Sequence, residues 1–238
     1  VVIWRMDPTS QIRLPTAAEL AARELRKQQE REYRLRAIRG AREQWAQARA
    51  PRALHPYLER KGLSAVGTQA LRIWGDALVV PVLWKGRIIS LQSITPDGQK
   101  RFWPGAPVKG GALVLDRPRA ALTAVCEGLA TGLAIFQSVR NARVIVAFDA
   151  GNLSPVVDTM RPSGSVVICA DDDHGTEARR GFNPGREKAT NAAELIGAGV
   201  AWPEGIEGTD WADALAEWGV SAHRRIERQI QAKARYVT

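Results

Sequence analysis

The stretch ALTAVCEGLA (residues 121–130) decides the fold of this chain, because an apolar run of strand length ends at a single acidic residue, Glu127, which a glycine follows. A second apolar run, SVVICA (165–170), opens onto three consecutive aspartates. Strand-like and helical patterns alternate around both runs. They predict strands at 121–126, 143–148, 165–170 and 199–202, and helices at 129–139, 153–160 and 184–197. Such alternation predicts an α/β fold with a parallel sheet covered on both faces.

Acidic side chains stand at the carboxyl ends of these predicted strands. In open parallel sheets, ligands bind beyond those ends. We therefore expect Glu127, Asp171 and Asp173 to reach one cleft although they lie far apart in the sequence. Asp210 and Asp213 follow the last predicted strand and could join them.

Crowded carboxylates indicate a bound cation. Like charges a few ångströms apart disfavour each other's ionisation, and a divalent cation removes that penalty. Mg²⁺ takes hard oxygen ligands, keeps several waters and usually completes its shell with substrate phosphate. We therefore expect Mg²⁺, or Mn²⁺ in its place, and a reaction that transfers a phosphoryl group.

The region before the α/β pattern predicts a small β-rich subdomain. Strand-like runs at 78–84 and 87–94 flank a Lys-Gly pair that predicts a hairpin turn. Pro81 suggests that the first run is an edge strand, since proline cannot donate to a ladder. The region ends in KGG (109–111), which places Lys109 on a flexible turn.

The positive charge of the chain lies in its flanks. The net charge is +9, but residues 51–220 carry 18 basic and 18 acidic side chains, while 16–50 carry 9 against 5 and 221–238 carry 5 against 1. Residues 16–50 predict a long helix and 221–235 a shorter basic one. Either helix could contact nucleic acid, or be a solvated helix or linker to a domain outside the chain. The expected units are a basic helical arm or linker (1–50), a β-rich N-terminal subdomain (51–111), the α/β domain (112–220) and a basic C-terminal helix (221–238).

The composition is that of a soluble globular protein, with 45% apolar and 25% charged residues. No apolar stretch approaches the roughly 20 residues that cross a bilayer, and no charged-then-apolar leader opens the chain. We therefore expect a cytoplasmic protein without a membrane partner. Cys126 and Cys169 both close apolar runs, which favours buried small hydrophobes over a redox or zinc role.

The order of these features resembles a known family. Strand, Glu-Gly, helix, strand, helix, strand and Asp-x-Asp over about residues 112–213 resemble the Toprim domain of DnaG-type primases, type IA and II topoisomerases and certain nucleases. The motif CEGLAT (126–131) looks like the Glu-Gly motif of phage and plasmid primases. Upstream segments follow the order of the N-terminal half of a DnaG-type RNA polymerase core, which topoisomerases and nucleases lack: VPV (80–82), GRII (86–89), KRF (100–102) and KG (109–110). HPYLERKGL (55–63) is similar to the opening segment of TraC-like primases of plasmids and phages.

The resemblance implies a DNA primase core that makes short RNA primers on single-stranded DNA from ribonucleoside triphosphates, in phage or plasmid replication. Glu127 would act near the attacking 3′-hydroxyl, as a metal ligand or proton acceptor. Asp171 and Asp173 would hold Mg²⁺ on the incoming triphosphate, with Asp210 as a further candidate ligand. The candidates for binding the triphosphate, other phosphates or the template backbone are Lys100, Arg101, Lys109, Arg186 and Lys188. Ordinary surface charge is the alternative for these basic residues.

Two partners are expected outside this chain. The sequence has no four-ligand zinc site for template recognition and no Gly-x-x-x-x-Gly-Lys-Ser/Thr loop of a helicase motor. We therefore expect a zinc-binding template-recognition domain and a helicase to be supplied elsewhere.

The chain departs from the bacterial primase pattern at three points. The family often has an aspartate four residues after the motif glutamate, where this chain has Thr131, so one metal ligand is missing. At the end of the strand after Gly86-Arg87, where the family pattern has an arginine, this chain has Ile94. Asp173 is followed by a longer loop, 174–183. The roles of Asp172, His174 and Asp213 stay open.

Eight tryptophans are unusual beside four phenylalanines. Proteins that bind single strands stack bases on aromatic rings, and Trp103, between Arg101 and Lys109, is the best stacking candidate. Four others follow apolar spacing and are expected in the core: Trp74, Trp84, Trp202 and Trp218.

Two other functions use the same features. A Toprim nuclease would use the carboxylates to activate water instead of a 3′-hydroxyl. A non-catalytic adaptor in a mobile-element replication complex would bind nucleic acid through the basic terminal helices.

Overall fold

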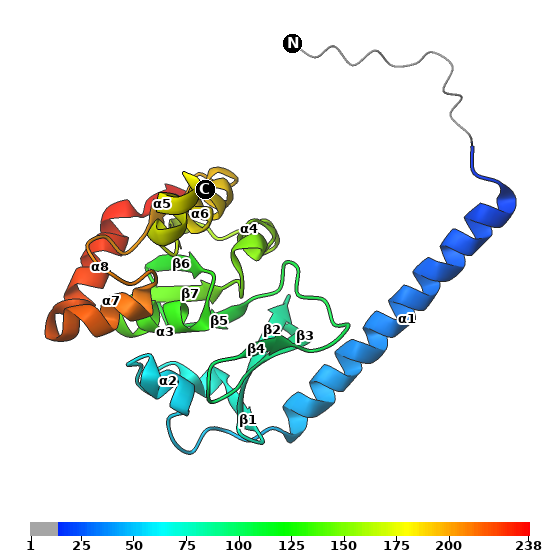
Figure 1. The fold of residues 1–238 in the computed structure, drawn as a ribbon, viewed down its shortest axis with the longest axis horizontal. Coiled ribbons are helices and arrows are strands. Elements are labelled where there is room, and N and C mark those ends of the chain that lie inside the picture. Colours follow the sequence, from blue (N-terminus) through cyan, green and yellow to red (C-terminus); the bar gives the residue numbers. More distant parts are fainter. Residues whose placement is uncertain (1–13) are drawn as a thin grey trace, which may run out of the picture.

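The computed structural model describes residues 14–238, so the first 13 residues of the predicted basic arm lie outside the described part. The described chain contains a four-stranded sheet and a six-stranded sheet that lie next to each other, with a long helix projecting from the smaller sheet (Figure 1). The α/β class expected from the sequence is confirmed.

The larger sheet has a parallel centre with antiparallel additions. Its strands are β5 (Leu113–Leu115), β6 (Leu122–Cys126), β7 (Ala142–Val146), β8 (Gly164–Cys169), β9 (Gly199–Ala201) and β10 (Arg235–Val237). They run in the order β10-β8-β6-β7-β5, and β9 also pairs with β8. Strands β6, β7, β8 and β9 are parallel, as predicted. Strands β5 and β10 were not among the predicted strands, and they pair antiparallel with β7 and β8. These three-residue strands carry too little pattern to give a direction in the sequence.

Helices cover both faces of this sheet, as expected. On one face lie α3 (Leu129–Ser138), α7 (Trp211–Trp218) and α8 (Ala222–Lys233), and on the other α4 (Leu153–Met160) and α6 (Pro184–Glu194). Gly132 allows α3 to lie close to the sheet, because it has no side chain there and a Cβ would stand only 2.5 Å from a Val146 methyl. The predicted loop 174–183 instead begins with a short helix, α5 (His174–Arg180). Helix α7 was not predicted.

The smaller sheet is antiparallel, in the order β1 (Arg72–Trp74), β2 (Ala77–Trp84), β3 (Arg87–Ile94) and β4 (Lys100–Phe102). The predicted hairpin turn is confirmed, since Lys85 and Gly86 both have positive φ, of 48° and 75°. Strand β2 is not an edge strand, because it lies between β1 and β3. Pro81 is nevertheless accommodated: it lies between Val79, the last partner of β1, and Leu83, which pairs with Ala112, so no strand needs its missing donor there.

The basic N-terminal segment forms α1 (Ala17–Gln47), close to the predicted 16–50. A capping box of Thr16 and Glu19 starts it, and it ends before Pro51. Its second half contacts the rest of the molecule: Ala41 and Trp45 pack against the smaller sheet at Leu91, and Tyr33 lies against the loop at Gly105. The earlier turns extend away from the body (Figure 1).

One hydrophobic core joins the two sheets. It contains Leu78, Val80 and Val82 of the smaller sheet together with Leu113 and α3 of the larger one. The C-terminal basic segment also belongs to the larger sheet, because α8 packs on α3 and α7 and is followed by β10. In the described part of the chain, none of the helices has the length and apolar character needed to span a bilayer.

Candidate active site

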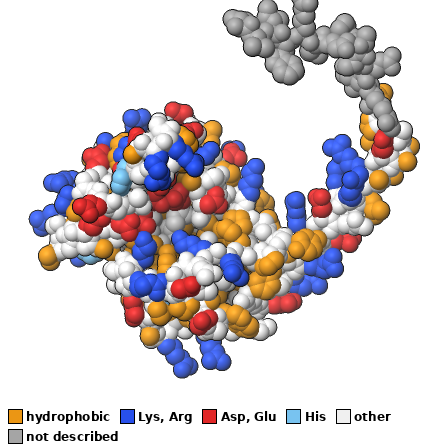
Figure 2. Space-filling view, viewed as in Figure 1, with side chains coloured by type: hydrophobic (Ala, Val, Ile, Leu, Met, Phe, Trp, Pro, Cys, Tyr) orange, Lys and Arg blue, Asp and Glu red, His pale blue; other side chains and the backbone are white. Residues whose placement is uncertain are grey.

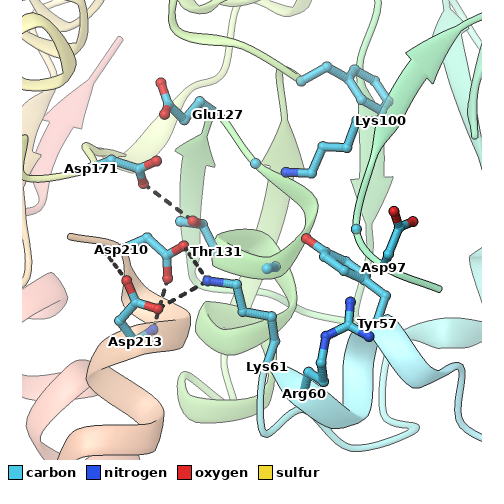
Figure 3. Close-up of a pocket in the computed structure, with 14 residues that line it drawn as sticks. Tyr57, Arg60, Lys61, Asp97, Lys100, Glu127, Thr131, Asp171, Asp210 and Asp213 are labelled. Atoms are coloured by element: carbon cyan, nitrogen blue, oxygen red, sulfur yellow. Dashed lines mark hydrogen bonds and ion pairs between the residues drawn. The ribbon is translucent and has the colours of Figure 1, made fainter. Parts of the chain in front are cut away.

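Strands β6 and β8 place two carboxylates at neighbouring strand ends. In their parallel register Cys126 lies opposite Cys169, so the residues that follow each strand leave the sheet at the same edge. Glu127 and Asp171 both line a cavity of about 600 Å³ between the two sheets (Figure 3). Gly185 lets α6 start beside them, because a Cβ there would stand 2.5 Å from the Asp171 carbonyl oxygen.

Asp171 is electrostatically strained in its charged form. Burial raises the pKa of its carboxyl well above the ordinary value, and the nearby Glu127 and Asp210 carboxylates raise it further. The Thr131 hydroxyl donates to Asp171 Oδ1 at 3.3 Å and opposes this rise. Thr131, where the family often has an aspartate, thus orients a carboxylate instead of adding one.

Asp210 and Asp213 reach the same cavity from the start of α7. They form a capping box, in which the Asp210 side chain accepts from the backbone N–H groups of Ala212 and Asp213. Lys61 Nζ donates to both carboxylates, at 3.2 Å to Asp210 and 3.0 Å to Asp213 (Figure 3). Partial burial alone would lower the pKa of Lys61, but the two carboxylates outweigh it and raise that pKa.

The smaller sheet and the helix before it supply a basic wall. Tyr57, Arg60 and Lys61 come from α2 (Pro56–Arg60) and its end, while Lys100 comes from β4. Lys100 Nζ lies 5.9 Å from the centre of the Tyr57 ring. On the surface, acidic side chains gather in the hollow in the middle of one face, with basic side chains below them (Figure 2).

The middle aspartate of the triplet faces away from the cavity. Asp172 is buried, accepts from Asn183 Nδ2 at 2.8 Å and forms an ion pair with Arg186 at 2.7 Å. Arg186 also stacks on Trp202, 4.4 Å from the ring centre. Its guanidinium is therefore engaged in holding α6 to the turn after β8.

The structure brings together only part of the predicted site. Glu127, Asp171, Asp210 and Lys100 line the cavity, and Asp213 joins them. Asp173 does not line it, but stands at the start of α5 with its N–H bonded to Asn183. The remaining candidates also lie outside its lining: Arg101, Lys109, Arg186 and Lys188. Their predicted roles stay predictions.

Sequence reasoning did not assign Lys61 or Arg60 to the site. Both lie in the HPYLERKGL segment, which carries a helix start signal: His55 caps α2 and Pro56 occupies its first turn. That signal locates a short helix. Its position against α7, about 150 residues later in the chain, is a tertiary property.

The expectations for tryptophan need correction. Trp103 packs against α1, where a Cβ on Gly40 would stand 3.0 Å from its ring, so it is a packing residue. Trp74 and Trp84 are 43% and 42% exposed and do not belong to the core. Trp74 ends the edge strand β1, and Trp84 ends β2 at the hairpin. An apolar run continues to both residues in the sequence although burial ends before them.

The carboxylates of the cavity fit a hard divalent cation that is shared with a substrate. Across residues 14–238, no three His, Cys, Asp or Glu side chains come close enough together to hold a metal ion by themselves. Glu127 and Asp171 form a close pair, whose mutual repulsion a cation would relieve. One or two carboxylates completed by phosphate oxygens is the usual protein contribution to a Mg²⁺ site.

The fold and its site define a class. Residues 122–221 match the model of the Toprim domain family. Its fold is that of primase catalytic domains. The DnaG primase catalytic domain bound to single-stranded DNA superposes with a TM-score of 0.51 at 15% identity, over 85% of this chain and 83% of that one. The zinc-binding and RNA polymerase domains of Aquifex aeolicus primase give a TM-score of 0.53 at 15% identity, over 84% and 60%.

The chain is more similar in sequence to a curated protein than to these structures. The chain is 32% identical to DNA primase TraC of Escherichia coli over 211 residues, which are 84% of this chain. It spans only 19% of the length of that relative. The chain is thus similar to a short part of this TraC primase and to the Toprim domain family over residues 122–221, and the resemblance inferred from its motifs is confirmed.

Proposed function

We propose that this chain is the catalytic core of a DNA primase, which synthesises short RNA primers on single-stranded DNA in plasmid or phage replication. The observation that carries the proposal is one cavity with acidic and basic walls. Glu127, Asp171 and Asp210 line it from the side of the larger sheet and its helix α7, and Lys61 and Lys100 from the smaller-sheet side. The similarity to TraC supports the same activity.

The carboxylates would hold Mg²⁺ or Mn²⁺, which when bound would neutralise phosphate charge and favour ionisation of the attacking hydroxyl. Glu127 would lie at the attacking 3′-hydroxyl and accept its proton or orient it. Asp171 would face the incoming triphosphate, with its carboxylate oriented by the Thr131 hydroxyl. Asp173 and Asp210 are further candidate ligands in this proposal.

The basic wall would bind phosphate. Lys100 has an exposed ammonium facing the carboxylates across the cavity (Figure 3), and a compact point charge suits a triphosphate. We propose that Arg101 and Lys109 bind the phosphates of the template backbone, because Arg101 is exposed on β4 and Lys109 is exposed in the loop that follows this strand. In this proposal Arg186 contacts phosphate only if its ion pair with Asp172 opens, whereas Lys188 is exposed on the same helix.

Partners outside the chain complete the proposal. The TraC relative is about five times longer than the matched part, which leaves room for further domains. The name of the Aquifex aeolicus neighbour includes a zinc-binding domain. We propose that a zinc-binding template-recognition domain and a helicase act with this core in the cytoplasm. We also propose that residues 51–111 and 112–220 act as the two walls of the active site.

The test is primer synthesis. The chain is incubated with single-stranded DNA, labelled ribonucleoside triphosphates and Mg²⁺ or Mn²⁺, with a zinc-binding primase domain added in trans, and the products are separated on a gel. Labelled oligoribonucleotides are expected. Absence of any product refutes the proposal, and DNA cleavage without nucleotide incorporation assigns the site to a nuclease instead.

A further inference from the structure

The tryptophan rings of this chain differ in what they contact. Most are engaged: cations lie over four rings, Trp45, Trp84, Trp202 and Trp218, and two others, Trp103 and Trp211, are packed. Trp74 is the exception among residues 14–238. It is 43% exposed, with no cation over its ring and no side-chain hydrogen bond.

Trp74 lines a second cavity, of about 640 Å³, on the edge of the smaller sheet. The other side chains in its lining include Gln47, Arg49 and Arg52, and no carboxylate lines it. Within the described part of the chain, the guanidinium groups of Arg49 and Arg52 make no ion pair or hydrogen bond. Asp76, the nearest acidic residue in sequence, is exposed in the adjoining turn. This cavity is therefore cationic and aromatic, whereas the candidate active site is lined by five carboxylates.

The backbone holds the walls of this cavity in place. Arg49 and Ile73 exchange two backbone hydrogen bonds, of 3.0 and 2.7 Å, so the segment after α1 runs beside β1. Arg72 stacks on Trp45 at 4.5 Å and fixes the end of α1 to the same strand. The indole and the two guanidinium groups are thus presented by ordered backbone, with their polar and aromatic surfaces turned to solvent.

A flat ring beside unpaired guanidinium groups suits a ligand with flat rings and phosphates. A single-stranded nucleic acid offers an open base face for the indole and phosphates for the arginines, whereas a duplex hides its base faces. We propose that this cavity binds single-stranded DNA, with one base on Trp74 and the neighbouring phosphates on Arg49 and Arg52. The identification of this DNA as the primase template rests on the proposed function, but the binding site does not.

Helix α2 connects this site to the carboxylates. The His55 Nδ1 accepts the Tyr57 N–H at 3.3 Å, so its Nε2 carries the proton and donates to the Asp76 carbonyl at 2.8 Å. The turn after Trp74 is thereby attached to the start of α2, whose other end leads to Lys61. DNA held at Trp74 would therefore lie at the outer end of the helix that forms one wall of the active site.

The test measures binding of fluorescein-labelled oligo(dT) by anisotropy in EDTA, where metal-dependent contacts are absent. Trp74→Ala is expected to raise Kd about tenfold, which corresponds to the loss of one stacked base, and Trp74→Phe to retain most of the affinity. Trp84→Ala is the matched control, because Trp84 is equally exposed on the same sheet but outside the cavity, and its Kd should stay unchanged. Replacing both Arg49 and Arg52 by glutamine should lower the slope of log Kd against log salt by about 1.4.

A second measurement locates the contact directly. Oligonucleotides with 5-iododeoxyuridine are crosslinked to the protein by light, and the crosslinked peptide is expected to contain Trp74. The inference is overturned if Trp74→Ala binds oligo(dT) like the unchanged chain, or if it weakens binding no more than Trp84→Ala. The two hypotheses fail separately. If Trp74→Ala binds normally and primers are still made, only the proposed binding site is rejected. If Trp74→Ala binds more weakly but the unchanged chain makes no primers, only the primase function is rejected.

Discussion

At the scale of single residues, Asp171 carries a charge that the surrounding protein disfavours. Its raised pKa means that the protonated carboxyl is the form favoured by folding. Its contribution to stability is fully present below the ordinary pKa of 3.8 and is lost as pH rises through the raised folded-state pKa. A neutral side chain of the same shape should avoid this loss.

Asp171→Asn is therefore expected to raise Tm at pH 8, by about 2–4 °C for each kcal/mol relieved, and to differ little from the unchanged chain near pH 4. Mg²⁺ should raise the Tm of the unchanged chain and have a smaller effect on the variant. Thermal unfolding with and without Mg²⁺ at both pH values checks this. A lower Tm for Asp171→Asn at pH 8 would contradict the electrostatic account.

Glu127→Gln and Asp171→Asn should each lower primer synthesis by at least about a hundredfold, as expected for loss of a group that acts on the reacting atoms. Binding of single-stranded DNA should stay nearly unchanged, because its phosphate contacts come from basic residues elsewhere. Gel assays of primer synthesis, with anisotropy as the control, measure both quantities. If both variants remain active, the site has been assigned to the wrong residues.

Lys61 neutralises two carboxylates at once. Lys61→Met should lower the free energy of unfolding by about 1–3 kcal/mol at pH 7, because it leaves Asp210 and Asp213 without their charged partner. Burial would raise the Asp213 pKa, but the Thr209 N–H and the Lys61 ammonium outweigh it and lower that pKa. The contribution of Asp213 to stability is therefore present above its ordinary pKa of 3.8 and is lost as pH falls through the lowered folded-state pKa. Urea unfolding at pH 7 and pH 3 should show the difference shrinking in acid. Lys61→Arg, which keeps the charge, is the control.

At the scale of elements, Asn152 holds the loop between β4 and β5, through which the chain passes from the smaller sheet to the larger one. Its buried side chain accepts from Gly110 N–H at 2.8 Å and donates to the carbonyls of Gly111 at 3.0 Å and Ala147 at 2.7 Å. These bonds fasten the loop that carries Lys109 to the end of β7.

Asn152→Ala should lower the free energy of unfolding by roughly 2–4 kcal/mol, since it leaves several buried backbone groups without partners. Urea unfolding measures the change. Asn141→Ala, at an exposed position, should stay within about 0.5 kcal/mol of the unchanged chain. An equally small effect of Asn152→Ala would show that the loop is held by other contacts.

At the scale of the whole molecule, the shared core predicts that both sheets unfold together. Leu78 lies in the smaller sheet but belongs to the same buried cluster as α3. Leu78→Ala should lower the free energy of unfolding by about 2–5 kcal/mol and shift a single transition to lower temperature. Calorimetry checks this through the ratio of calorimetric to van't Hoff enthalpy. Two separate transitions would mean that the two sheets are independent units.

The sequence alone was sufficient for the local pattern and for the edge at which the site forms. Strands β6, β7, β8 and β9 follow from short apolar runs between turns, and Glu127 and Asp171 from their places after two of these runs. Because parallel strands end at one edge of a sheet, the order of residues already implies that these two carboxylates lie together.

Other features were decided only in three dimensions. The pairing of Lys61 with Asp210 and Asp213 joins residues about 150 positions apart, and no periodicity reports a contact of that kind. The same holds for Asp172, which is chemically identical to its neighbours but faces Arg186 and not the cavity. Side-chain pattern gives the face of a local element, because backbone geometry repeats with a fixed period. Which elements meet, and so which charges are neutralised and which rings stay exposed, depends on the packing of the whole chain.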